Sequence, residues 1–271
     1  MIAFFRRIRQ QLLAKNKVSR YLLYALGEIA LVMIGILLAL QVNGWNKART
    51  DQIEEQQVLR QLKMEFETNR TQIQDKIQLH REIVASGLSI LGIVDAPEDL
   101  KPLDSLYFHL GKTLTAPTFD PSLGVTNDLI NSGKLYLIKS DSLRRLISGW
   151  SGDIVFATEE ELIWRKMRDE KFIPFLIESM SFRNIVNAAN GNKKIKALMN
   201  FGRTYEALNA GPSKIHKIVH RRFQVSELEA LEDQVIGLTN FNHICITQMT
   251  ELRNVVDHIL EIIDKEIVVT Q

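Results

Sequence analysis

Two short motifs in this chain contain residue types that could bind a nucleotide or a metal ion. Gly111-Lys112-Thr113 matches the end of a phosphate-binding loop, but the glycine that such a loop requires five positions before Gly111 is replaced by Leu106. His216 and His220 lie on one face of a predicted helix, a spacing that could hold zinc, but Lys217 and two neighbouring arginines would repel a cation. We therefore predict no cofactor and no metal site.

Glu28 is an ionisable residue about a turn and a half inside an apolar stretch, where a carboxylate costs about 2 to 3 kcal/mol unless it is paired, protonated or near enough to the interface to be wetted. It could lie at the depth of the lipid headgroups and pair with Arg20. It could instead form a hydrogen bond across a helix–helix contact, aided by the small residues Gly27, Gly35 and Ala39. A third interpretation is ion coupling, as in the stator subunits that energise outer-membrane transport.

The remaining composition does not indicate an enzyme or a nucleic-acid-binding protein. The sequence contains no Gly-x-Ser-x-Gly elbow and no carboxylate pair that stands apart from helix-surface charge. The formal net charge is +2, but six basic residues fall among the first 20, so the rest of the chain is mildly acidic. Cys245 is the single cysteine, which excludes an intramolecular disulfide, and we expect it to be buried. We therefore predict no enzymatic activity and no nucleic-acid partner.

The elements that must position these residues begin with a membrane anchor. Residues 1–20 are basic and predict a cytoplasmic amphipathic segment, and residues 21–43 are apolar over a length that spans about 30 Å of hydrocarbon. Because the Lys/Arg excess precedes the apolar segment, the N-terminus is expected in the cytoplasm and residues 44–271 in the periplasm. A cleavable signal peptide is the alternative, but no small-x-small cleavage site follows the apolar core. The predicted location is the inner membrane, with the lipid bilayer as a partner.

Two long helices are predicted beyond the anchor. From 47 to 91 the chain lacks proline and has apolar residues three and four positions apart, so the membrane helix could continue without a break. From 226 to 263 a heptad pattern runs without a slip, with Asn242 as its strongly polar member. The last helix could line an antiparallel bundle or form an oligomeric coiled coil. The predicted fold is all-α: one transmembrane helix followed by an extracytoplasmic antiparallel helical bundle with a long first and a long last helix.

Shorter helices are predicted between the two long ones. Their expected ranges are 103–114, 126–132 closed by Gly133, 140–147, 153–180 with a kink at Pro174, 193–208 and 213–220. Loops are expected at 95–102, 115–121 and 184–192.

Asn69 and Asn242 are predicted to pair in the core. If the two long helices are antiparallel and Trp45 is level with Ile267, counting along both helices brings the two amides to the same height. Paired amides would satisfy each other and fix the register of the helices.

The N-terminal residues resemble the signature of an uncharacterised family of membrane-anchored proteins from Bacteroidota, especially flavobacteria. The matching stretches are 4–10, 16–17, 21–29 and 34–46, and a second, weaker pattern covers 119–121, 128–135 and 143–144. The resemblance implies an integral membrane protein with a helical extracytoplasmic domain. It implies no known activity.

Three functions follow from these observations as hypotheses. The first is a non-enzymatic, single-pass membrane protein whose periplasmic helical domain is an interaction or scaffolding module, with a second copy or another envelope protein as partner. The second is a ligand-sensing helical bundle that acts through a partner, with a pocket lined by Trp150, Trp164, Phe172 and Phe175. The third, an enzyme, would need side chains brought together from distant helices.

Overall fold

The computed structural model describes residues 18–97, 103–191, 210–211 and 225–268. All regular secondary structure in these ranges is helical. The elements are α2 (Val18–Val94), α3 (Leu103–Thr113), α4 (Gly124–Asn131), the 3-10 helix η2 (Lys134–Leu137), α5 (Asp141–Met167), the π-helix η3 (Arg168–Phe172), α6 (Ile173–Ser179), α7 (Phe182–Gly191) and α10 (Val225–Glu266). The chain forms two compact units, Met1–Gln57 and Val58–Gln271.

The described part of the first unit is the N-terminal part of α2. Its large apolar side chains from Leu31 to Val42 are exposed, and within the described residues α2 is the one helix long and apolar enough to cross a membrane. An apolar surface of this extent is unfavourable in water and is typical of a helix that can span a membrane. The predicted segment 21–43 lies within this helix.

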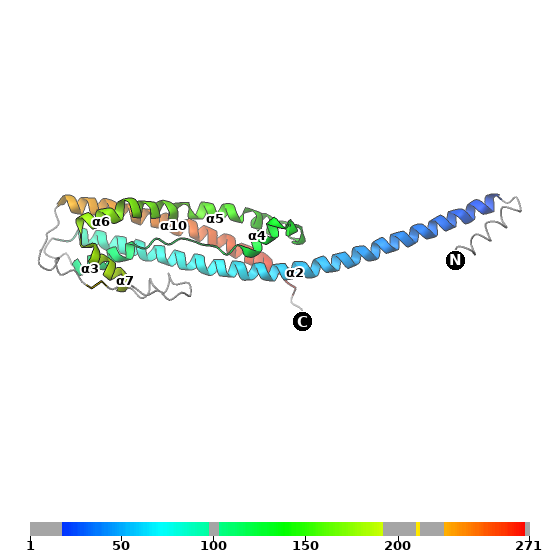
Figure 1. Ribbon diagram of the computed structural model, residues 1–271, viewed down its shortest axis with the longest axis horizontal. Coiled ribbons are helices and arrows are strands. Elements are labelled where there is room, and N and C mark those ends of the chain that lie inside the picture. Colours follow the sequence, from blue (N-terminus) through cyan, green and yellow to red (C-terminus); the bar gives the residue numbers. More distant parts are fainter. Residues whose placement is uncertain (1–17, 98–102, 192–209, 212–224, 269–271) are drawn as a thin grey trace. The chain divides into compact units, whose positions relative to one another are not determined.

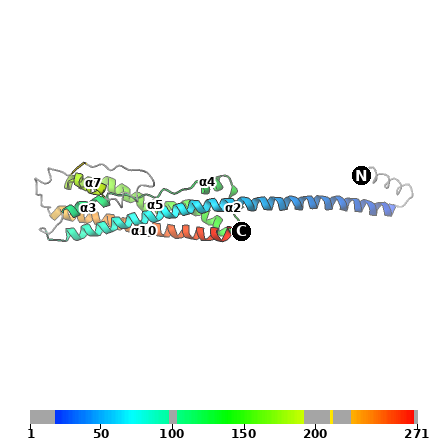
Figure 2. The ribbon, with the colours of Figure 1, turned by 90° about the horizontal axis from the view of Figure 1, so that it is seen from below.

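In the second unit, the C-terminal part of α2 lies beside α5 and α10 (Figure 1 and Figure 2). α10 runs back along α2, since Lys63 lies 2.7 Å from Asp264 and Arg70 lies 2.6 Å from Asp257. Side chains three and four positions apart on each helix face the neighbouring helices and form the core, as amphipathic helices require.

The core consists of two apolar clusters that occupy successive stretches of the same helices. The first contains Phe66, Ile73 and Ile77 of α2, Ile147, Trp150 and Ala157 of α5, and Met249 to Ile263 of α10. The second contains Ile83 and Ile90 of α2, Trp164 of α5, Leu231, Val235 and Leu238 of α10, and residues of α3, η3, α6 and α7. On each long helix, polar residues lie between the two clusters.

Residues 115–123, here called the strap, connect α3 to α4 without regular secondary structure. Figure 1 shows the strap running alongside the long helices. Its backbone groups lack the partners that a helix supplies, so side chains of the helices must satisfy those that are buried.

Several sequence predictions are confirmed. The apolar N-terminal helix continues through 47–91 as α2, helix 103–114 is α3, and helix 226–263 is α10. Gly133 has φ of 69°, the left-handed conformation expected of a residue that closes a helix.

Two element predictions are wrong. The break between 147 and 153 does not exist, because Ile147, Trp150 and Ala157 keep one face of α5 buried through the Ser-Gly pairs. The loop at 184–192 is the helix α7 up to Gly191. The helix predicted over 153–180 is interrupted just before Pro174, where the chain forms the π-helix η3 between α5 and α6. Proline has no backbone N–H, so it cannot donate the hydrogen bond that a continuous α-helix needs at this position. Helices 193–208 and 213–220, with His216 and His220, lie outside the described residues, as does the segment before Val18.

Candidate functional site

A row of polar side chains follows the buried face of α2. Glu65, Asn69, Lys76 and His80 are all buried and recur at helical spacing. Buried polar groups persist only when they have partners, so this row indicates specific contacts rather than general packing. The partners come from the strap, α4, α5 and α10.

Glu65 binds the start of α4. One carboxylate oxygen accepts a hydrogen bond from the backbone N–H of Val125 at 2.6 Å. The other accepts from the backbone N–H of Thr126 at 3.1 Å and from its hydroxyl at 2.6 Å. α4 has no capping side chain of its own at Leu123, so the distant Glu65 takes the role of an N-cap and places negative charge at the helix N-terminus.

Asn69, one turn further along α2, binds the strap at Ser122. Its Oδ1 accepts a hydrogen bond from the backbone N–H of Ser122 at 2.7 Å, and its Nδ2 donates to the carbonyl of Ser122 at 2.8 Å. The amide therefore replaces the two partners that a neighbouring strand would supply. Glu65 and Asn69 together fix the end of the strap and the start of α4 on α2.

The predicted pairing of Asn69 with Asn242 is wrong. Asn69 binds Ser122, whereas Asn242 binds His80. The assumed starting point of the count caused the error: Asp264, near the end of α10, pairs with Lys63, which lies 18 positions after Trp45 in the sequence. Asn242 is therefore level with His80, three turns beyond Asn69 on α2.

His80 is the centre of a buried layer that joins three helices and the strap. Its Nδ1 lies 2.8 Å from Oδ1 of Asn242 on α10, and its Nε2 lies 3.2 Å from Oε1 of Glu161 on α5. Oε2 of Glu161 accepts a hydrogen bond from the backbone N–H of Phe119 at 2.9 Å. Nδ2 of Asn242 donates to the carbonyl of Leu238 at 2.7 Å. This polar layer lies between the two apolar clusters.

Two further groups border the polar layer. Burial lowers the pKa of Lys76, while the carboxylates of Glu161 and Asp120 act in the opposite direction. Burial raises the pKa of the Cys245 thiol to about 12, and the negative charge of Glu161 adds to the effect. The prediction that Cys245 is a buried residue is confirmed, and its thiol stays protonated at neutral pH.

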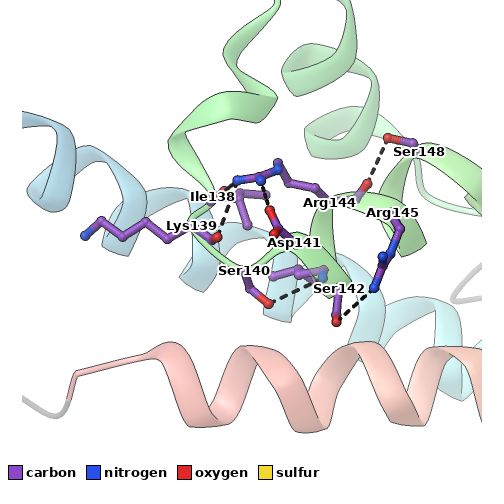
Figure 3. A network of polar contacts seen from close by, with 9 residues as sticks. Ile138, Lys139, Ser140, Asp141, Ser142, Arg144, Arg145 and Ser148 are labelled. Carbon is purple, nitrogen blue, oxygen red and sulfur yellow. Dashed lines mark hydrogen bonds and ion pairs between the residues drawn. The ribbon is translucent and has the colours of Figure 1, made fainter.

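The first end of the strap and the start of α5 are also tied by side chains. Nη1 of Arg168 in η3 donates to the carbonyl of Leu114 at 2.9 Å, just before the strap. At the start of α5, Figure 3 shows Arg144 pairing with Asp141 and donating to the carbonyl of Ile138. These contacts fix the residue just before the strap and the non-helical residues 138–140 that lead from η2 into α5.

The sequence motifs take ordinary structural roles where the structure describes them. Gly111 lies inside α3, where a Cβ atom would be 2.6 Å from the backbone nitrogen of Ala189, so its small size permits the contact with α7. Nζ of Lys112 lies 3.1 Å from Glu82. Among the described residues, no group of three or more His, Cys, Asp or Glu side chains could hold a metal ion.

The aromatic residues expected to line one pocket lie in different parts of the core. Trp150 belongs to the first cluster and packs edge-on against Phe66, with ring centroids 5.3 Å apart. Trp164 and Phe172 belong to the second cluster, with centroids 6.2 Å apart. These rings therefore fill the two clusters by packing.

Sequence reasoning did not find the polar layer. The sequence pattern assigned no role to Glu65, Lys76, His80 or Glu161, although Lys76 and His80 flank the core residue Ile77 at helical spacing. The transmembrane candidates Glu28, Gly27, Gly35 and Ala39 lie on the anchor part of α2. A Cβ atom at Gly27 or Gly35 would meet no atom within 4 Å.

In the part of the chain that the structure describes, all regular secondary structure is thus helical, and one apolar helix is long enough to span a membrane. Residues 28–156 match the model of a family described as a family of unknown function, DUF6090. The matched region contains Glu65, Asn69 and their partners in the strap and α4, whereas Glu161 and Asn242 lie beyond it. The match agrees with the resemblance to an uncharacterised family. Searches of curated proteins and of solved structures found no match.

Proposed function

We propose that the chain is a non-enzymatic, single-pass inner-membrane protein whose periplasmic antiparallel helical bundle is an interaction or scaffolding module. The proposal of a membrane anchor is supported by the apolar part of α2, whose exposed side chains would be unfavourable in water. The basic residues before it favour a cytoplasmic N-terminus.

The outer face of α5 carries the proposal of an interaction module. It contains four large apolar side chains with exposed fractions of 69% for Val155, 60% for Phe156, 50% for Leu162 and 39% for Ile163. Gly152 lies on the same exposed face, where a Cβ atom would meet no atom within 4 Å. Val155 and Phe156 lie seven positions before Leu162 and Ile163, so the four side chains fall on one side of α5, the heptad spacing by which one helix packs against another. Such a face fits an amphipathic helix of a second copy or of another envelope protein.

Site-specific crosslinking in native membranes tests this proposal. A photoreactive phenylalanine analogue replaces Phe156, and a matched variant carries it at Tyr136, which is 66% exposed. We expect one defined product, a homodimer or a single envelope protein, from position 156 and not from position 136. Loss of that product in a Leu162→Glu variant would support the face as the contact. Equal labelling at both positions, or no product at 156, would contradict it.

Membrane topology is tested separately by reporter fusions. A reporter active only in the periplasm should work when fused after Gln271 and fail when fused before Met1. The reverse pattern would contradict the proposed orientation.

The role of Glu28 is a separate question within this proposal. Glu28→Gln keeps the size of the side chain and removes its charge. Under both interpretations the variant should still form the crosslinked product. Under the scaffolding interpretation the activity of the crosslinked complex is unchanged, whereas under the ion-coupling interpretation that activity is lost.

A further inference from the structure

Glu159 lies at the centre of the exposed face of α5, between two apolar pairs. The first apolar pair is Val155 and Phe156, and the second is Leu162 and Ile163. Glu159 is exposed and lies three or four positions from each of these residues, on the same side of the helix. A partner helix that covers both apolar pairs therefore also covers Glu159. A carboxylate that loses water without gaining a partner is costly, so the residue opposite Glu159 decides which helix can bind.

A second copy of the chain does not match this face well. If two copies pair with their α5 helices parallel about a two-fold axis, each residue in the contact faces its own copy, so Glu159 faces Glu159. If the helices are antiparallel and the apolar pairs are matched, Val155 faces Ile163 and Phe156 faces Leu162. The two-fold axis then passes through position 159. In both arrangements two carboxylates meet at the centre of the contact and repel each other.

Other antiparallel registers lose either the charge match or the apolar match. A slide of one heptad brings Glu159 opposite Lys166, but the acidic residues 169–170 then cover the first apolar pair. A slide of one heptad in the other direction brings Lys166 opposite Arg145, and these like charges repel. Slides of three or four positions place Glu159 on an apolar pair of the other copy, where its charge has no partner. A helix of different sequence is needed to match the apolar pairs and the charge together.

We propose that the exposed face of α5 binds an amphipathic helix of a different protein, which carries a lysine or arginine opposite Glu159 with large apolar residues three or four positions away on both sides. This inference rests on the proposed interaction module and narrows its partner. An ion pair with the basic residue offsets the loss of water around Glu159. Lys166, one heptad further along the same side of α5, is also exposed and favours an acidic residue one heptad from that basic residue.

Crosslinking with two tags separates the possible occupants. Cells express two copies of the full-length protein that carry different affinity tags, both with the photoreactive phenylalanine analogue in place of Phe156. The adduct is isolated from native membranes, and the crosslinked peptide is sequenced by mass spectrometry. We expect an adduct that contains one tag only, with a peptide from another protein. That peptide should contain a lysine or arginine with large apolar residues three or four positions before and after it.

Charge reversal tests the contact at Glu159 itself. We expect Glu159→Lys to lower the yield of the adduct about tenfold, because an attraction becomes a repulsion. Glu251→Lys makes the same change at an exposed position of α10 and should leave the yield unchanged. Replacement of the partner's basic residue by glutamate should restore the adduct with Glu159→Lys.

The outcomes distinguish this inference from the proposal on which it rests. An adduct that carries both tags would show that a second copy binds, which overturns the inference and leaves the interaction module intact. A peptide without a basic residue between apolar positions, or a yield that Glu159→Lys does not lower, would also overturn the inference alone. No adduct at position 156 would contradict the interaction module and this inference with it.

Discussion

Replacement of Glu65 by glutamine should destabilise the second unit strongly for so small a change. In the native protein both carboxylate oxygens accept hydrogen bonds, from Val125 and from Thr126. A glutamine has one oxygen, so in either orientation its NH₂ group faces a backbone N–H that needs an acceptor. Loss of one hydrogen bond to a charged group costs about 1.5 to 3 kcal/mol, and an unsatisfied buried donor adds about 1 kcal/mol or more. We expect a loss of about 3 kcal/mol.

Glu67→Gln is the matched control, because Glu67 lies two residues further on α2 but is exposed. Nζ of Lys63 lies 3.9 Å from the carboxylate of Glu67, and exposed ion pairs of this kind contribute about 0.5 kcal/mol or less. The free energy of unfolding is measured by urea denaturation of the full-length proteins in detergent micelles, followed by tryptophan fluorescence. If Glu65→Gln and Glu67→Gln have the same stability, Glu65 does not cap α4.

Three further predictions concern close contacts and the buried thiol. Gly111→Ala should lower the free energy of unfolding by about 2 kcal/mol, because its Cβ would lie 2.6 Å from a backbone nitrogen of α7. Gly149→Ala, in open space on α5, should raise it by up to about 1 kcal/mol. Thermal unfolding of both variants checks this, and equal shifts in the unfolding temperature would refute the α3–α7 contact. Gly87→Ala should destabilise the second unit because its Cβ would lie 2.1 Å from a threonine hydroxyl of α10, while Gly92→Ala on the same helix should not. Thermal unfolding is again the measurement, and a Gly87→Ala variant as stable as the wild type would contradict the close contact between α2 and α10. Cys245, whose pKa burial raises to about 12, should resist alkylation at pH 8 until urea unfolds the protein; mass spectrometry of the alkylated protein detects the change, and rapid labelling of the native state would show that the thiol is accessible.

The long helices could be predicted because their evidence is local. Apolar residues repeat at helical spacing over many turns of α2 and α10, and the predicted limits of 226–263 differ from Val225–Glu266 by a few residues. The same local evidence misplaced a break within α5. The helix continues through the Ser-Gly pairs at 148–149 and 151–152 because Ile147 and Trp150 are buried against other helices.

The polar layer could not be predicted because it depends on the relative height of helices that are distant in sequence. His80 and Asn242 are separated by 162 positions, and their contact depends on where α10 begins to pack against α2. A count that starts from Trp45 and Ile267 misplaces the two helices and gives Asn242 the wrong partner. The strap presents the same difficulty, since its attachment to Glu161 and Asn69 uses backbone atoms that carry no sequence signal.

The separation of the core into two apolar clusters affects how the sequence of this domain can diverge. A change in side-chain volume is normally transmitted to every residue it packs against, so one substitution in a continuous core demands others. Here the polar layer interrupts that transmission, because its atoms are positioned by hydrogen bonds rather than by the volumes of their neighbours. The half built by α3, η3, α6 and α7 can therefore be remodelled while the half next to Glu65 and Asn69 is retained.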